Sequence, residues 1–399
     1  MIFVVGSAAL LLVIVAYYAF IWRNEVNFTN AMDHGYLFAD YQLHFEPMGH
    51  EILRTHKPVA GWYYSPMFAI ALSPFATLDL RAGMQVWGVL QVAAAVMLCL
   101  IPGYWLLEEL RSLRPALAYV ALCATAHPLL ANYAWGQTST FIVLAWICSI
   151  IAYARQRHLT AAALLVLATS IKYYPALWIA HIATRRDRQT LVLIAVLGGL
   201  MLILLPFIVL GWNDMLQFQR LVEDNLRASD WFSQDANSQF LPHVLARLTG
   251  AGLRLGYAVT YTLFAANLVA VWLLRRKTGR AALLAPVFLL LSVPLAVRTS
   301  WPHYFGYLPF CQVMLWWMTS LVGLSRSRRI VLRCGIAASV VASNILFFNL
   351  VANWEAYGRL GAPLLANALL IAVAWALLPG VRKVDTPRGA SSTSAASLQ

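Results

Sequence analysis

The stretch MIFVVGSAALLLVIVAYYAFIW, residues 1–22, decides the class of fold because it contains no charged residue. An apolar run of this length is long enough for one helix to cross a hydrocarbon core of about 30 Å. The stretch lacks the basic residues that begin a cleaved signal peptide, and its apolar run is longer than a typical signal core. We therefore expect a membrane helix over 2–22 that the mature protein retains.

The rest of the chain repeats this character, since 61% of its 399 residues are hydrophobic and only 11% are charged. A water-soluble globule of this size needs more polar surface. Further apolar segments lie at 84–107, 115–133, 137–154, 159–172, 174–184, 190–210, 256–274, 281–298, 305–323, 330–350 and 362–379. The sequence therefore predicts an all-α polytopic membrane protein with about twelve transmembrane helices, in which the short segments 159–172 and 174–184 form a broken pair within the bundle.

The net charge of +13 is distributed as short basic clusters between the apolar segments. They are ELRSLR (109–114), RQR (155–157), RRDR (185–188), RRKTGR (275–280), SRSRR (325–329) and VRK (381–383). Such clusters are typical of cytoplasmic loops, so we expect a multi-pass protein of the cell membrane with both termini in the cytoplasm. Twelve of the sixteen acidic residues then fall outside. Nucleic-acid binding is disfavoured because no soluble basic face remains.

This topology predicts a single membrane domain over 1–383, followed by a disordered cytoplasmic tail at 384–399 that is rich in small residues. Its two long loops, 23–82 and 212–255, lie on the outer face. Within the first loop, segment 64–80 is apolar but interrupted by two prolines, which indicates a re-entrant or interfacial helix. Loops held on a rigid scaffold commonly carry the chemistry.

The first outer loop contains LFADYQLHFEPMGHEIL, residues 37–53, an acidic and imidazole-rich stretch in an otherwise apolar chain. Asp40 lies among aromatic residues that favour the boundary between water and lipid. Partial desolvation there raises the pKa of a carboxylate, which suits a general base. Spacing alone does not choose Asp40 over Asp33, Glu46 or Glu51, each of which also fits a solvated loop acid.

Two further outer helix ends carry cationic or imidazole side chains. Lys172, in TSIKYYPALW, ends an apolar segment and fits either a membrane-surface anchor or a ligand for a lipid phosphate. Arg298 and His303 lie together in RTSWPHY, where they fit the binding of a negatively charged leaving group.

The remaining polar candidates are His44, Gln137, Asn237 and Gln239, which fit either contacts to an acceptor in the site or structural hydrogen bonds. The sequence contains no phosphate-binding G-x-x-x-x-G-K-[ST], no H-E-x-x-H, no G-x-S-x-G, no paired C-x-x-C and no D-x-D. We therefore predict neither a metal site nor a cofactor.

An ordered set of short motifs resembles glycosyltransferase family 87, the polyprenyl-phosphate-mannose-dependent mannosyltransferases of the C-type membrane glycosyltransferase fold. The motifs are ADYQLHF, WYYSPMFAIALSPFATL, HPLLANYAWGQ, SIKYYPAL, NSQFLPHVLARL and SWPHYF. The sequence departs from the family in reading Asn237-Ser238-Gln239 for its Asn-Gln-Ser, and in having Pro302 beside His303.

The resemblance implies an inverting, metal-independent transfer of a hexose, mannose by analogy, from a polyprenyl-phosphate-sugar donor to a hydroxyl of a glycan or glycolipid on the outer face. It implies that Asp40 is the general base and that Lys172, Arg298 and His303 bind the donor phosphate or sugar. The main alternative is a transporter or lipid flippase, which predicts charged groups near the bilayer midplane and two matching halves of the chain.

Overall fold

The computed structural model describes residues 3, 6–8, 38–227, 233–250, 252–351 and 354–383. Almost all of the predicted first span, 2–22, lies outside the described residues, as does the predicted tail, 384–399.

The described chain is helical throughout, and within these residues it contains no β-strand, although one isolated bridge joins Ala126 and Asn344. This confirms the predicted all-α class. The elements, in chain order, are η1 (Tyr41–Phe45), α3 (Glu46–Arg54), α4 (Pro66–Leu72), η2 (Ser73–Thr77), α5 (Leu80–Leu110), α6 (Leu113–Thr125), α7 (His127–Trp135), α8 (Ser139–Ala154), α9 (His158–Ile171), η3 (Tyr174–Ala176), α10 (Leu177–Thr184), α11 (Arg188–Gly198), η4 (Gly199–Leu204), α12 (Leu205–Leu210), α13 (Trp212–Arg227), α14 (Leu241–Thr249), α15 (Leu253–Leu273), α16 (Gly279–Ala282), α17 (Leu284–Leu291), α18 (Val293–Ala296), η6 (Pro302–Phe305), α19 (Leu308–Leu321), α20 (Arg326–Ala342), α21 (Ile345–Val351), α22 (Trp354–Arg359) and α23 (Ala362–Lys383).

Four helical segments of the described chain are long and apolar enough to cross a membrane: Leu80–Leu110, Arg188–Leu210, Leu253–Leu273 and Glu355–Lys383. Further apolar helices are shorter, and they include Ser139–Ala154 and His158–Ile171. The count of about twelve crossings and the C-type fold stay predictions.

Prolines explain why several predicted spans are divided. The segment 115–133 breaks at Ala126, between α6 and α7. Pro128, two residues later, occupies the first turn of α7. The segment 281–298 is divided into α16, α17 and α18, with Pro294 in the first turn of α18. Proline has no backbone N–H to donate to the preceding turn, so a helix commonly ends before it.

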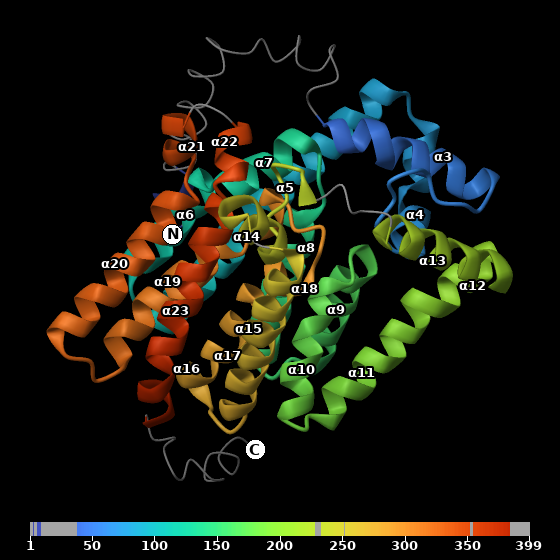
Figure 1. Cartoon of the computed structure of the whole chain (residues 1–399). Coiled ribbons are helices and arrows are strands. Elements are labelled where there is room, and N and C mark those ends of the chain that lie inside the picture. The colour runs from blue at the N-terminus through green and yellow to red at the C-terminus, as the bar shows by residue number, and fades with distance from the viewer. Residues whose placement is uncertain are drawn as a thin grey trace, which may run out of the picture.

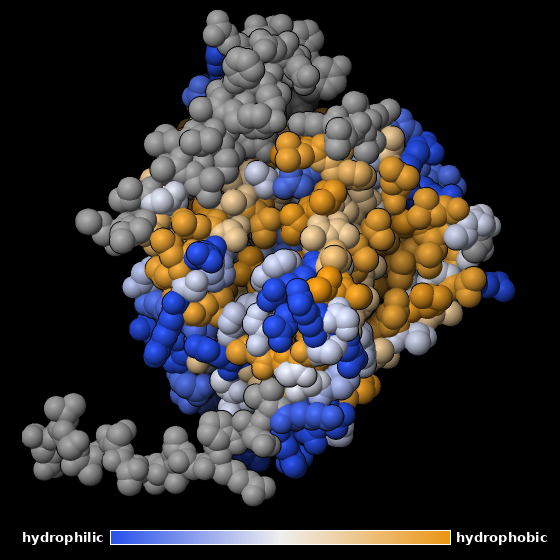
Figure 2. All heavy atoms as spheres, turned by 90° about the vertical axis from the view of Figure 1, so that its left-hand side faces the viewer, coloured by the Kyte–Doolittle hydropathy of each residue, from blue (hydrophilic) through white to orange (hydrophobic). Residues whose placement is uncertain are grey.

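The two ends of the bundle differ in the residues that they carry (Figure 1). The helices α7, α14, α21 and α22 gather at one end, with η1 and α3 to one side. The turn from α10 to α11 and the segment from α15 to α16, both of which carry basic clusters, lie at the opposite end. Figure 2 shows broad hydrophobic areas on one side of the molecule, with hydrophilic side chains mainly in its lower half. This partition agrees with the charge pattern of the sequence.

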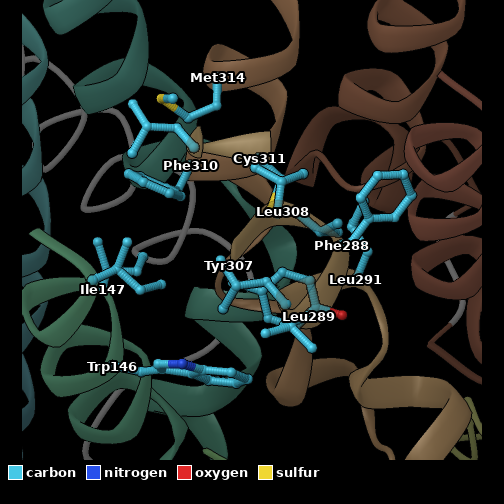
Figure 3. Packing of buried hydrophobic residues seen from close by; sticks show 14 of the residues in the cluster. Trp146, Ile147, Phe288, Leu289, Leu291, Tyr307, Leu308, Phe310, Cys311 and Met314 are labelled. Atoms are coloured by element: carbon cyan, nitrogen blue, oxygen red, sulfur yellow. The ribbon is translucent and has the colours of Figure 1, made fainter. Parts of the chain in front are cut away.

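The main core lies where α8, α17 and α19 meet (Figure 3). Trp146 from α8 and Phe288 from α17 are fully buried, as is Met314 from α19. This packing forms the centre of the bundle, and the peripheral helices surround it.

A second cluster, mostly aromatic, supports the segment that carries Asp40. Phe45 of η1 makes edge contacts with Trp62, Tyr64 and Trp87, with ring centroids 5.2 to 6.1 Å apart. The element η1 is a π-helix, which holds one residue more in its turn than an α-helix does. The buried rings therefore fix the direction in which η1 presents its neighbours.

Gly136 joins this segment to the end of α7. It has φ of +69°, and a Cβ built on it lies 3.1 Å from Cα of Phe38. The backbone N–H of Phe38 in turn donates to the carbonyl of Ala134 at 2.8 Å. Only glycine combines this left-handed conformation with so close an approach of two backbones.

We expect Gly136→Ala to lower the free energy of unfolding by more than the roughly 1–2 kcal/mol of the left-handed conformation alone, because Phe38 must also move. Gly250→Ala is the matched control, since Gly250 has φ of +67° with nothing within 4 Å of its added Cβ. Thermal unfolding of both purified variants measures the difference. An equal loss in the two variants contradicts the proposed contact with Phe38.

Candidate active site

Asp40 directly precedes η1 and is only 5% exposed. Its Oδ2 accepts a hydrogen bond from Nε2 of Gln137, and its Oδ1 lies 3.9 Å from Nε2 of His44. Burial raises the pKa of the Asp40 carboxyl, and the hydrogen bond from Gln137 and the charges of His44 and Lys172 oppose this rise. A carboxylate with a raised pKa and a defined orientation has the properties of a general base.

Gln137 links Asp40 to Tyr64, which lies in the predicted first outer loop. Its Oε1 accepts a hydrogen bond of 2.7 Å from the hydroxyl of Tyr64. Both the oxygen and the nitrogen of the Gln137 amide are therefore hydrogen-bonded. The bond from Tyr64 holds the amide in the orientation in which it donates to Asp40 Oδ2. Gln137 follows Gly136 directly, so the turn after α7 positions it.

Lys172 immediately follows α9 and lies between two tyrosine rings. Its Nζ is 4.2 Å from the ring centre of Tyr64 and 4.4 Å from that of Tyr304, and it donates to the Tyr304 hydroxyl at 2.9 Å. Lys172 is 6% exposed and forms no ion pair with any carboxylate in the described chain. It is therefore not extended to the surface as an anchor, and a buried cation with unused donors favours an anionic ligand.

A cavity of about 640 Å³ opens beside Lys172. Arg298 and Thr299 line it near Lys172, and the Tyr304 hydroxyl lies 3.2 Å from the Thr299 hydroxyl. Its remaining lining includes the apolar side chains of Leu177, Ala180, Phe264 and Leu268. The cavity, which we call the cationic cavity, is thus charged at one part of its wall and apolar at another.

Arg298 is exposed and donates to the Tyr257 hydroxyl at 2.9 Å, above whose ring its guanidinium lies. Arg227, at the end of α13, also lines the cationic cavity. Its contact with Glu223 is long, at 3.5 Å. The wall of this cavity therefore carries three cations from separate elements.

His303 does not share this cavity. It lines a second one of about 370 Å³, the aromatic cavity, with His127, Trp135, Trp301 and Asp235. His303 is 2% exposed, and its Nε2 has no hydrogen-bond partner among the described residues. Burial, together with the charge of Lys172, keeps the pKa of His303 well below its usual range, so the imidazole is neutral.

Tyr304 lines the cationic cavity and also contacts a residue of the aromatic cavity. Its ring contacts both His303, with centroids 5.0 Å apart, and the ammonium of Lys172. Lys172 and Arg298 thus line the cationic cavity, whereas His303 lines the aromatic cavity.

The remaining predicted polar residues, His44, Asn237 and Gln239, lie in three different surroundings. His44 lies beside Asp40, as above, and its ring also approaches Gly61. Asn237 lines the aromatic cavity, and its backbone N–H donates to Asp235 at 2.9 Å. Gln239 is fully buried and lines neither cavity. Its backbone N–H donates to the carbonyl of Ser300 at 2.6 Å and its side chain to that of Gly358 at 3.0 Å, so it ties the second outer loop to its neighbours.

The sequence analysis did not single out Tyr64, Tyr304 or Arg227, although the first two lie inside quoted motifs. Tyrosines are common at membrane interfaces, so their presence in the sequence did not predict a role. Their contacts with the Lys172 amine are visible only in the fold. Within the described residues, no group of three His, Cys, Asp or Glu side chains could hold a metal ion.

Comparison with known families gave one result. The model of glycosyltransferase family 87 matches residues 62–285, which is more than half of the 399 residues. The matched range includes Tyr64, Gln137 and Lys172, whereas Asp40, Arg298 and His303 lie outside it. No curated protein and no solved structure matches the chain.

Proposed function

Because this chain belongs to glycosyltransferase family 87, we propose that it transfers a hexose from a polyprenyl-phosphate-sugar donor to a hydroxyl of a glycan or glycolipid acceptor on the outer face of the membrane. Mannose is proposed on the family resemblance. The observation that carries the proposal is the connection from Asp40 through Gln137 and Tyr64 to Lys172, which pairs with no carboxylate among the described residues. Two hydrogen bonds and one contact between the Lys172 amine and the Tyr64 ring thus connect a buried carboxyl to a buried lysine.

In the proposed reaction, Oδ1 of Asp40 accepts the proton of the acceptor hydroxyl, since Oδ2 is already engaged by Gln137. The acceptor oxygen attacks the anomeric carbon while the bond from that carbon to the phosphate oxygen breaks. The electron pair of the broken bond leaves with the phosphate. Attack from the face opposite the leaving group inverts the configuration, and fixed groups supply the orientation.

The cationic cavity suits the donor. Lys172 and Arg298 place positive charge where the departing phosphate gains negative charge, and positioned charges of this kind stabilise a transition state strongly in a water-poor site. The apolar side chains of Phe264 and Leu268 on the same cavity suit the first isoprene units of a lipid. A donor that reaches the site through the bilayer needs no nucleotide pocket.

The aromatic cavity suits the sugar of the acceptor. The side chains of Trp135 and Trp301 offer flat apolar surfaces for a sugar ring, and Asp235 and Asn237 offer polar contacts. The neutral imidazole of His303 adds a ring nitrogen with no partner among the described residues. We therefore propose a binding role for His303 toward the acceptor sugar rather than toward the donor phosphate.

The proposal is tested with the purified chain in lipid nanodiscs. Radiolabelled polyprenyl-phosphate-mannose and polyprenyl-phosphate-glucose are supplied in parallel with alkyl glycosides as acceptors, and NMR of the product gives the anomeric configuration. We expect transfer with inversion from one lipid-linked donor and none from a nucleotide sugar. Movement of the donor lipid across vesicles without sugar transfer identifies a flippase instead, and overturns the proposal.

We expect Gln137→Leu to move the acid limb of the pH dependence of kcat/KM to higher pH. The hydrogen bond from Gln137 favours the ionised form of Asp40, so its loss raises the pKa of the carboxyl further, and a base must be ionised to act. Gln91→Leu is the matched control, because Gln91 is a buried glutamine whose partner is Asn132 rather than Asp40. An identical acid limb in both variants removes Gln137 from this role.

A further inference from the structure

A third cavity, of about 190 Å³, lies at the end of the bundle opposite Asp40, where α5, α8, α10 and α16 meet (Figure 1). Its lining includes Trp105, Glu109, Tyr153, Trp178, His181 and Arg185. None of these residues takes part in the proposed transfer, and the cavity lies among the basic clusters of the predicted cytoplasmic side. We call it the inner cavity.

Two of the residues that line the inner cavity carry a buried nitrogen atom with no hydrogen-bond partner within the described chain. The two atoms are Nε1 of Trp178, a residue 1% exposed, and Nδ1 of His181, a residue 2% exposed. The two rings stack with centroids 4.5 Å apart and an interplanar angle of 17°. A buried donor without a partner is unfavourable, so an acceptor atom from a ligand or from water has a place here.

Of the charged residues that line the inner cavity, Arg185 has no acidic partner among the described residues. Glu109 is paired with Arg280, whose Nε lies 3.1 Å from its Oε1 and whose Nη2 donates to its carbonyl. Arg185 donates from Nη1 to the carbonyl of Lys277 at 2.8 Å and forms no ion pair with a carboxylate in the described residues. Arg185 also hydrogen-bonds the side chain of Tyr153, and because a guanidinium carries five N–H donors, others remain for another acceptor.

We infer that the inner cavity binds a phosphate group, either the headgroup phosphate of an anionic lipid or free phosphate. The indole N–H of Trp178 and the guanidinium of Arg185 are its donors, and His181 Nδ1 donates in the tautomer that carries its proton on that atom. Basic pockets between membrane helices on the cytoplasmic side are suited to anionic headgroups, and arginine binds phosphate oxygens in pairs. The cavity volume of about 190 Å³ is of the size of a headgroup phosphate rather than of a whole lipid.

The test uses the full chain in phosphatidylcholine nanodiscs with or without phosphatidylglycerol. Native mass spectrometry measures how much phosphatidylglycerol stays bound after transfer to detergent. We expect Arg185→Gln to reduce this retention about tenfold, as the loss of a charged hydrogen bond predicts. Arg188→Gln is the matched control, because it removes the same charge three residues away from an exposed arginine that does not line the cavity.

A second arm distinguishes the source of the phosphate. In phosphatidylcholine nanodiscs alone, inorganic phosphate is compared with chloride at equal ionic strength, and the Tm is measured. A rise in Tm that Arg185→Gln abolishes assigns the site to free phosphate. Retention of phosphatidylglycerol without such a rise assigns it to the lipid headgroup.

The inference is overturned if Arg185→Gln and Arg188→Gln behave alike in both arms. Trp178→Phe provides an independent variant should Arg185→Gln fail to fold, since it removes one N–H and keeps the ring. It is compared with Trp272→Phe, an exposed tryptophan on α15. Equal retention in these two variants overturns the inference as well.

Discussion

Asp40→Asn is expected to lower the rate of sugar transfer by roughly 10²–10⁴-fold, the usual contribution of a general base. The amide has the shape of the carboxyl and its oxygen still accepts from Gln137, but it takes up no proton from the acceptor. Initial rates from the lipid-linked donor at saturating acceptor measure the effect. Burial at 5% exposure means that no neighbouring water readily substitutes for the base.

The control for this prediction is Asp224→Asn, which removes an exposed carboxylate on α13. We expect its rate to match that of the unaltered protein. The Tm of Asp40→Asn should not fall, because the substitution removes a charge from a buried site. A folded Asp40→Asn protein with a nearly unchanged rate would show that another group is the base.

Lys172→Met is expected to reduce transfer by about 10²–10³-fold, the range found when one positioned donor to a developing charge is removed. The same variant should not lose stability in the absence of donor. Lys172 is a buried cation without an ion pair among the described residues, and methionine fills similar space without the cost of desolvating a charge.

The pairing of these two readouts separates a functional lysine from a structural one. If Lys172 served only to hold Tyr64 and Tyr304 together, Lys172→Met would lower the Tm and leave the rate per folded molecule unchanged. Lys57→Met, at an exposed lysine of the first outer loop, is the control for the loss of one charge. The Tm is measured on protein freed of bound lipid donor, and the rate is measured after donor is added.

Much of the fold could be predicted from the sequence because hydropathy and charge are local properties. The helices α5, α15 and α23 lie where the predicted apolar segments lie, and the family is confirmed. The divisions within 115–133 and 281–298 were missed, since an apolar run looks continuous in a hydropathy pattern whether or not its backbone bonds continue. The breaks after α6 and around α17 are of this kind.

The arrangement of the site depended on contacts that no local pattern contains. The bond from Tyr64 to Gln137 joins residues 73 positions apart, and that from Lys172 to Tyr304 spans 132 positions. The sequence placed Arg298 and His303 together because they are close in the chain. In the structure, Arg298 lines the cationic cavity and His303 lines the aromatic cavity. We therefore propose that the two residues bind different substrates.

Because η1 is a π-helical turn, the direction of the Asp40 side chain relative to α3 depends on the number of residues between them. An α-helix turns by about 100° for each residue. Loss of one codon between Gln42 and His44 would convert the wide turn into an ordinary one and swing Asp40 by roughly that angle relative to α3. Every side chain around the carboxyl would survive such a change, yet the carboxyl would face elsewhere.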